Sequence, residues 1–239
     1  MAQTDAGKHS APHDLQFIVG RMQQVKAEAS TGPVHVLREY LLAKGDSGEV
    51  TSQVLAQVDY DSHRAVQYSI QKTTGSSRGE DVVKRVLDHE VSAQSRATAI
   101  TDENYYFEFA GQAAFDGSDC YLLRLNPKRK DSGLISGQAW VDQRSFQIRH
   151  IAGELVKTPS WWLKNVSVEI TFGNVEGRWM QTRTEASADV RMAGARTLKS
   201  QLLTSQEEGA KSVEVARNSG RRPSTVIPAE VLLFPLHKR

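Results

Sequence analysis

The segment "SGQAWVDQRSFQIRHIAGEL" (Ser136–Leu155) decides the class of fold. Polar and apolar residues alternate on both sides of "WVDQRS", which predicts two antiparallel strands joined by a tight turn. We expect Asp142 and Gln143 at that turn. The second strand is expected to divide its side chains between two faces, with Phe146 and Ile148 on one and Arg149 and Ile151 on the other.

The same pattern extends over most of the chain. Three strand-like runs at 34–43, 49–60 and 65–72 are separated by the short turns "KGDSG" and "DSH", and they predict an antiparallel meander. Further strand-like runs follow at 105–115, 120–126, 134–142, 145–155, 164–173, 178–190 and 195–203. No helical pattern interrupts this second block, which argues against a parallel α/β fold.

Two segments have the helical period instead. From Asp14, a suitable N-cap, to about residue 29, apolar residues recur at helical spacing: Leu15, Ile18, Val19, Met22 and Val25. The segment 76–97 repeats the pattern with Val83, Val86, Leu87 and Val91, and Ser77 followed by Glu80 resembles a capping box. The chain is therefore predicted to be α+β and mainly antiparallel β.

Composition limits the classes of function. The chain has 239 residues and a net charge of only +2, without a sustained basic stripe, so we expect no nucleic-acid partner. A single cysteine excludes an intramolecular disulfide. The polar start "MAQTDAGKHSAPHD" has no signal-peptide core, and no run of about 18 apolar residues follows. Two readings fit this start: a cytoplasmic protein, or an exported one whose signal was removed and replaced by Met1.

No pattern of residues predicts a catalytic or metal site. His89 and Glu90 lack the second histidine one turn later that a zinc helix needs. Cys120 lies within the alternating run "CYLLRL" and is expected to be a small buried residue rather than a nucleophile. Five acids could supply a glycosidase pair, but their spacing selects no two of them: Asp102, Glu103, Glu108, Asp142 and Glu154. We expect no catalytic residue, no metal ligand and no cofactor.

The run "VSVEITF" carries the clearest apolar face. Alternation places four side chains on that face: Val166, Val168, Ile170 and Phe172. A long curved sheet with such a face needs a covering helix or an apolar ligand. Val83 and Leu87 of the second helix are expected to face the sheet as part of a lid. These six residues are the predicted lining of a ligand cavity, and the alternative is a closed core beneath the helices.

Several phrases resemble bacterial outer-membrane lipoprotein-sorting proteins of the LolA-like superfamily. They are "VVKRVLDHEV" (82–91), "NYYFEFAGQAAFDGSDCYLLRLNPKRKDSGLISGQAWVD" (104–142), "FQIRHIAGELVKTPSWW" (146–162) and "VEITFGNVEGRWMQTRTEASADVRMAGARTLKSQ" (168–201). The shared features are a tyrosine-containing strand followed by "PKR", a "WVD" turn, and "G-x-W" opening a late strand. No ligand-contact motif of the family is matched, so no functional residue is carried over.

The resemblance implies an incomplete, curved antiparallel barrel of about eleven strands whose open concave side is covered by helices. It also implies a periplasmic location after removal of a signal peptide. Under this interpretation residues 1–13 are a flexible tail and 14–203 a single half-barrel domain. Residues 204–239 are a polar loop and the segment "TVIPAEVLLFP", which could return to the sheet.

The resemblance favours a non-enzymatic carrier or chaperone that binds the acyl chains of a lipid or lipoprotein in the half-barrel. One alternative is an envelope-stress sensor, or another protein-interaction module, that uses the same fold to bind a membrane protein of the envelope. A second alternative is a hydrolase that uses Cys120 or an acid pair. These three hypotheses require different features on the sheet: an apolar cavity, a protein-binding surface, or a set of catalytic side chains.

Overall fold

The computed structural model describes residues 15–28, 32–45, 47–61, 66–92, 98–159, 161 and 163–203. This part of the chain forms two helices, α1 (Leu15–Glu28) and α2 (Ser77–Ser92). Its ten strands are β1 (Val34–Lys44), β2 (Val50–Tyr60), β3 (Gln67–Gly75), β4 (Tyr105–Phe115), β5 (Ser118–Pro127), β6 (Ile135–Asp142), β7 (Ile148–Leu155), β8 (Leu163–Val175), β9 (Arg178–Val190) and β10 (Gly194–Leu202). The expected tail at 1–13 and the segment 204–239 lie outside the described residues.

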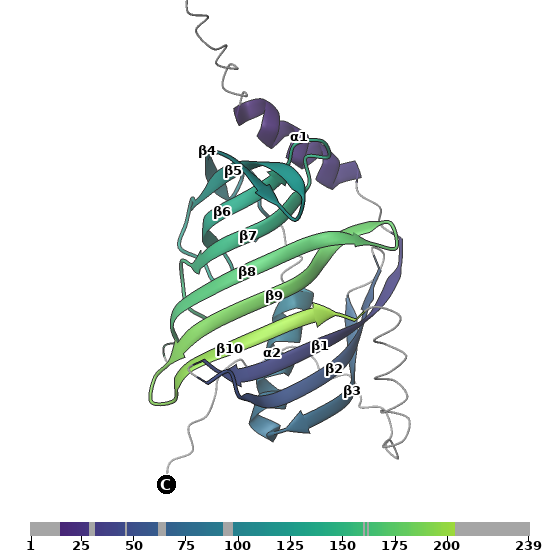
Figure 1. Cartoon of the computed structure of the whole chain (residues 1–239), viewed down its shortest axis with the longest axis vertical. Helices are drawn as coiled ribbons and strands as arrows, with labels where there is room; N and C mark the ends of the chain where they lie inside the picture. The colour runs from purple at the N-terminus through teal and green to yellow at the C-terminus, as the bar shows by residue number, and fades with distance from the viewer. Residues whose placement is uncertain are drawn as a thin grey trace, which may run out of the picture.

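All ten strands belong to one antiparallel sheet, in the order β3-β2-β1-β10-β9-β8-β7-β6-β5-β4 (Figure 1). Neighbours in the sheet are also neighbours in the chain, with one exception: β1 pairs with β10. The prediction of a curved, mainly antiparallel sheet covered by helices is confirmed. The described residues supply ten of the roughly eleven strands that the family resemblance implies.

The strand register defines one face of this sheet. Residues directly opposite one another on paired strands point to the same side. One such row crosses eight strands: Val54, Tyr40, Ser200, Thr184, Ile170, Ile151, Ala139 and Leu123. The face on which this row lies is called the inner face below, and the opposite side is the outer face.

Helix α2 covers the inner face over β2 and β3. Its apolar residues Val83 and Leu87 are one turn apart, and both are fully buried in a cluster with Tyr40, Val54 and other residues of β1 and β2. The residue that caps helix α2 lies one position before the expected one. Ser76 Oγ, not Ser77 Oγ, accepts the hydrogen bond from the Gly79 amide, at 3.2 Å. The prediction that Ser77 caps this helix is therefore wrong.

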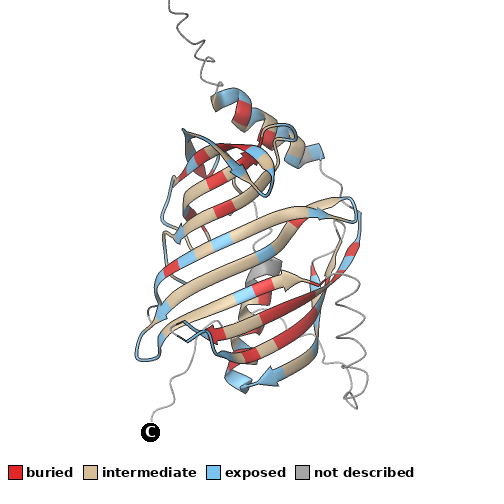
Figure 2. Cartoon of the chain, in the orientation of Figure 1, coloured by how far each residue is buried: buried red, intermediate tan, exposed pale blue. Residues whose placement is uncertain are grey.

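Helix α1 covers the inner face at the other end of the sheet, over β5 and β6 (Figures 1 and 2). Ile18 and Met22 lie one turn apart and pack against Tyr121, Leu123 and Val141. A third apolar cluster contains Leu134 and buried residues of β4, β5, β6 and β7. All three apolar clusters thus lie on the inner face.

The β6–β7 hairpin corrects one expectation from the sequence. Residues of β6 are paired with His150 and Ile148 but not with Arg149, because a β-bulge interrupts the register there. Ile148 and Ile151 consequently share the inner face, so the prediction that they point to opposite faces is wrong. The turn itself begins at Asp142, as expected.

Candidate functional site

The inner face is least covered at its centre. On β1, β2, β5 and β6, most apolar residues of this face are buried. On the central strands β8, β9 and β10, several apolar residues of the same face remain only half-buried, among them Val168, Ile170, Phe172, Ala186, Leu198 and Leu202. These six residues are called the central strip.

The central strip connects two of the apolar clusters. Val168, Ile170 and Phe172 pack against the cluster built around β4–β7, whereas Leu198 and Leu202 pack against the cluster beneath α2. Ala186 lies between them, opposite Val168 on β8 and Leu198 on β10. The strip is therefore a partly exposed apolar surface in the middle of the sheet, where a globular core is normally driest.

A group of polar residues borders the strip. Arg38 of β1 is only 1% exposed, and its Nη1 donates a hydrogen bond to Ser200 Oγ at 3.0 Å. Its Nη2 donates a second bond to the carbonyl oxygen of Gln181 on β9. The Gln181 amide in turn donates to the Thr184 hydroxyl, which lies beside Ile170 in the register. These fixed hydrogen-bonding groups thus lie among the apolar residues of the strip, with Ser200 between Leu198 and Leu202 on β10.

The residues predicted from the sequence fall into two groups. Val83 and Leu87 are fully buried in the core beneath α2, and Val166 is 7% exposed. Val168, Ile170 and Phe172 belong to the central strip. That these residues line a ligand cavity stays a prediction, although Val83, Leu87, Val168, Ile170 and Phe172 lie on the side of the sheet that the prediction requires.

Sequence reasoning missed the other half of the strip. Ala186, Leu198 and Leu202 lie in segments where polar residues such as Arg196 and Ser200 occupy the same face, so the alternation on β9 and β10 is weak. The strand register identifies them: Ala186 is paired with Val168, Leu198 with Leu42, and Leu202 with Arg38. Pairing between distant strands cannot be read from a local pattern.

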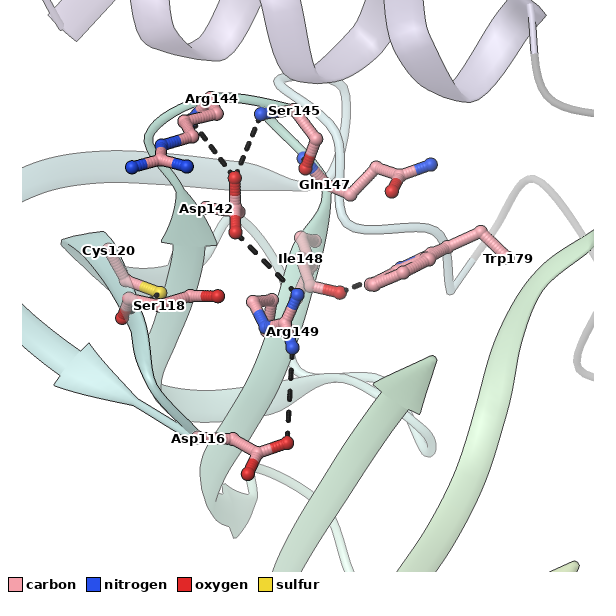
Figure 3. A network of polar contacts seen from close by, with 10 residues as sticks. All are labelled: Asp116, Ser118, Cys120, Asp142, Arg144, Ser145, Gln147, Ile148, Arg149 and Trp179. Carbon is pink, nitrogen blue, oxygen red and sulfur yellow. Dashed lines mark hydrogen bonds and ion pairs between the residues drawn. The ribbon is translucent and has the colours of Figure 1, made fainter. Parts of the chain in front are cut away.

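Cys120 lies in a polar network at the end of β5 (Figure 3). Its side chain is fully buried, and Sγ donates to the Ser118 carbonyl oxygen at 3.6 Å. Burial raises the pKa of the Cys120 thiol, and the charge of Asp142 adds to the rise. A thiol with a raised pKa carries little thiolate at neutral pH, which is the opposite of what a cysteine nucleophile requires.

Asp142 and Arg149 stabilise the hairpin in this network. The Asp142 carboxylate accepts hydrogen bonds from the Arg144 and Ser145 amides at 2.9 and 2.8 Å. Arg149 lies between Asp142 and Asp116, at 3.6 and 3.9 Å from their oxygens (Figure 3). Burial alone would raise the pKa of Asp142, but the two amide hydrogen bonds and the Arg149 charge outweigh it and hold that pKa below its usual value.

The remaining candidates for acid chemistry lie on the surface. Glu108 pairs with Arg124 at 3.2 Å and accepts a hydrogen bond from Asn126 at 2.9 Å. Asp102, Glu103 and Glu154 are exposed. Within the described ranges, no three His, Cys, Asp or Glu side chains gather as metal ligands. The side chains of His89 and Glu90 lie outside the described set.

The tryptophans do not contribute to the central strip. Trp140 stands on the outer face opposite His150, and the two rings are 4.9 Å apart. The His150 ring also stacks on Phe115 at 4.5 Å. Trp179 donates its indole N–H to the Ile148 carbonyl oxygen at 2.9 Å, whereas Trp161 is 69% exposed. Trp162 is outside the described residues.

Comparison with known proteins yields matches among solved structures. No protein-family model and no curated relative matches the chain. A domain described as an outer membrane lipoprotein-sorting protein from Vibrio parahaemolyticus is 13% identical; the match covers 82% of this chain and 97% of that one, with a TM-score of 0.43. A LolA superfamily protein from Nitrosomonas europaea is 13% identical, over 79% of this chain and 93% of that one, with a TM-score of 0.40.

A third solved structure is the MucA/MucB complex of Pseudomonas aeruginosa, which matches at 9% identity and a TM-score of 0.28. This match covers 82% of the present chain and 96% of the matched chain. The solved structures thus include the superfamily that the sequence resembles. Neither helix in the described part of the chain is long and apolar enough to cross a membrane.

Proposed function

We propose that the protein is a non-catalytic carrier that binds a hydrocarbon chain along the central strip of the inner face. The acyl chain of a lipid or of a lipoprotein has the required chemistry. The carrier would act in the periplasm, as the resemblance of the sequence to lipoprotein-sorting proteins implies.

The half-burial of the central strip is the observation that carries this proposal. Ile170 and Leu198 lie on central strands of a ten-stranded sheet, yet neither is fully buried. Leaving such side chains in contact with water forgoes stabilisation, because each buried methylene contributes about 0.8 kcal/mol. A bound chain would cover the strip and would itself gain a similar amount for each methylene that leaves water.

The chemistry of the neighbouring groups also favours binding over catalysis. Asp142, a candidate acid whose pKa is lowered, is engaged by the turn of the β6–β7 hairpin. The thiol of Cys120 is buried and has a raised pKa. Shape and apolar surface are sufficient to bind an acyl chain, because the hydrophobic effect is not directional.

Titration with a fluorescent fatty acid tests the proposal. We expect saturable binding and displacement by long-chain fatty acids at lower concentrations than by short-chain ones, because affinity increases with each buried methylene. Ala186→Glu should weaken binding at least tenfold, since it places a charge in the middle of the strip. Lys199→Gln is the matched control, because it changes the net charge equally but lies exposed on the outer face of β10.

Circular dichroism must show that both variants are folded. Absence of probe binding to folded wild-type protein, together with absence of copurifying lipid, would overturn the proposal. Equal weakening by Ala186→Glu and Lys199→Gln would place the probe elsewhere. A stable complex with the external domain of an envelope membrane protein, unchanged after delipidation, would favour the alternative of a protein-interaction module.

A further inference from the structure

Exposed apolar side chains gather at one end of the central strands. Trp161, in the β7–β8 connection, is 69% exposed, and Met192, in the β9–β10 turn, is fully exposed. The β8–β9 ladder pairs Leu163 with Val190, and each exposed residue lies two positions beyond this pair. The ladder therefore brings Trp161 and Met192 to the same end of the sheet. This region, formed by the described residues of 157–164 and by 189–196, is called the tip.

The backbone at the apex of the tip is unusual. Met192 adopts a positive φ of 67°, a conformation that unbranched L-residues other than Asn and Asp rarely occupy. The β9–β10 turn thus holds a large apolar side chain entirely in water, where glycine or asparagine would normally be found. Among the five described non-glycine residues with a positive φ, Met192 is the one whose side chain is both apolar and fully exposed.

The tip is also strongly basic. Its two segments contain four cations, Lys157, Lys164, Arg191 and Arg196, against one carboxylate, Asp189. The whole chain carries a net charge of only +2, so positive charge is concentrated here. Lys157, Lys164 and Arg191 are exposed. A basic surface around projecting apolar groups complements the anionic headgroups of a bilayer.

A shallow polar depression lies beside the tip on the outer face. Asn165, Asp189, Arg196, Ser187 and Thr197 are among its lining residues. The two hydroxyl oxygens are 3.2 Å apart. The Asn165 amide donates to the Asp189 carboxylate at 3.4 Å, and Arg196 Nη1 donates to the Ala195 carbonyl oxygen at 2.8 Å. The depression therefore adds no anion site, and the attraction of the tip for anionic lipid comes from its exposed cations.

We infer that the tip is a docking surface for an anionic lipid bilayer. Trp161 and Met192 insert between the headgroups, where tryptophan is favoured, and the exposed cations contact lipid phosphates. The inference rests on the proposed carrier function, because a carrier of acyl chains must reach the membrane that supplies or receives them. The strip and the tip share strands β8, β9 and β10, so docking brings the binding face close to the lipid.

Vesicle flotation with the full chain tests this docking. The vesicles contain phosphatidylcholine alone or phosphatidylcholine with one quarter phosphatidylglycerol. Wild-type protein should float with the anionic vesicles, and raised salt should weaken the association. Trp161→Ala or Met192→Ala should weaken binding about tenfold, and Arg191→Gln about fivefold. Phe17→Ala is the control, because Phe17 is 57% exposed on α1, away from the tip (Figure 1).

The inference is overturned if folded wild-type protein does not float with anionic vesicles, or if Phe17→Ala weakens flotation as much as the tip variants. It is also overturned if flotation requires a membrane protein in the vesicles. The fluorescent fatty acid separates this result from the proposed function. Fatty-acid binding without flotation overturns only the inference that the tip docks on a bilayer. Flotation without fatty-acid binding overturns only the proposed carrier function.

Discussion

Gly137 and Gly153 lie directly opposite each other on β6 and β7, on the inner face of the sheet. A Cβ atom added to Gly137 would lie 2.1 Å from the Ala152 carbonyl oxygen, and one added to Gly153 would lie 2.3 Å from the Ser136 carbonyl oxygen. Both distances are far below van der Waals contact with rigid backbone atoms. The two strands therefore approach each other at this point more closely than any other pair of residue types permits.

This close approach predicts that Gly153→Ala is destabilising. The added methyl group must displace the β6 backbone, and overpacking of this kind typically costs about 1–3 kcal/mol. We expect a clear decrease in the midpoint of urea denaturation. Gly20→Ala in α1 is the control: no atom lies within 4 Å of the added Cβ, and alanine favours the helix by roughly 0.5–1 kcal/mol. A Gly153→Ala variant as stable as wild type would contradict the close approach.

The core beneath α2 predicts a large effect at Leu87. The side chain is fully buried against β1 and β2, so Leu87→Ala should lower the free energy of unfolding by about 2–5 kcal/mol. Leu87→Asp should be still more disruptive, because it buries an unpaired charge. Lys84→Ala, at a half-exposed position of the same helix, should change stability by less than about 0.5 kcal/mol. Thermal melting curves compare the three variants, and an unchanged curve for Leu87→Asp would place α2 in solvent.

Cys120 is predicted to be structural and unreactive. Because burial raises its pKa, the thiol of the native protein should react with a thiol reagent at pH 7 at least a hundredfold more slowly than that of the urea-unfolded chain. Cys120→Ala should leave fatty-acid binding unchanged. Rapid labelling of the folded protein, or loss of an activity without loss of folding, would revive the hypothesis of a cysteine hydrolase.

His150 predicts a dependence of stability on pH. Burial lowers its pKa in the folded protein, although Glu169 partly opposes the shift. The unfolded chain, with a histidine pKa near 6.5, then binds more protons than the folded one as the pH falls below that value. This contribution to stability is fully present above about pH 6.5 and is lost progressively as the pH decreases toward the folded-state pKa.

His150→Phe removes this titrating group and keeps an aromatic ring beside Phe115 and Trp140. Urea denaturation at a series of pH values between 4.5 and 7.5 compares it with wild type. The wild-type stability should fall more steeply with decreasing pH below 6.5 than that of the variant. Parallel curves for the two proteins would show that His150 titrates alike in both states.

Local sequence patterns predicted the positions of helices and strands better than the face on which each side chain lies. Val83 and Leu87 were assigned correctly to the buried side of a helix, because a period of 3.6 residues is written in the sequence itself. Ile148 and Ile151, expected on opposite faces, share one face because a bulge at Arg149 adds one residue, and a shift of one residue inverts a strand. The capping residue, Ser76 rather than Ser77, was missed by a single position.

The candidate site was predictable only in part for a related reason. Three residues of the central strip lie on β8, where alternation is regular. The others lie on β9 and β10, where Thr184, Arg196 and Ser200 share the inner face and weaken the apolar pattern. Half-burial is a property of the assembled sheet, because it depends on which strands the two helices cover. A local stretch of sequence contains no information about that coverage.

The pairing of β1 with β10 has a consequence for how the chain acquires its structure. The hydrogen bond between Arg38 and Ser200 joins residues 162 positions apart, whereas all other neighbouring strands are also consecutive in the chain. The meander β1–β3 with α2, and the meander β4–β10, can each begin to form from local contacts, but their union requires the closure of a very long loop. During synthesis β1 is therefore an unprotected edge until β10 has emerged. Strand β10 joins the two meanders, because it pairs with β1 on one side and with β9 on the other. A chain shortened before Gly194 would expose two long strand edges, on β1 and β9, and would be prone to aggregate.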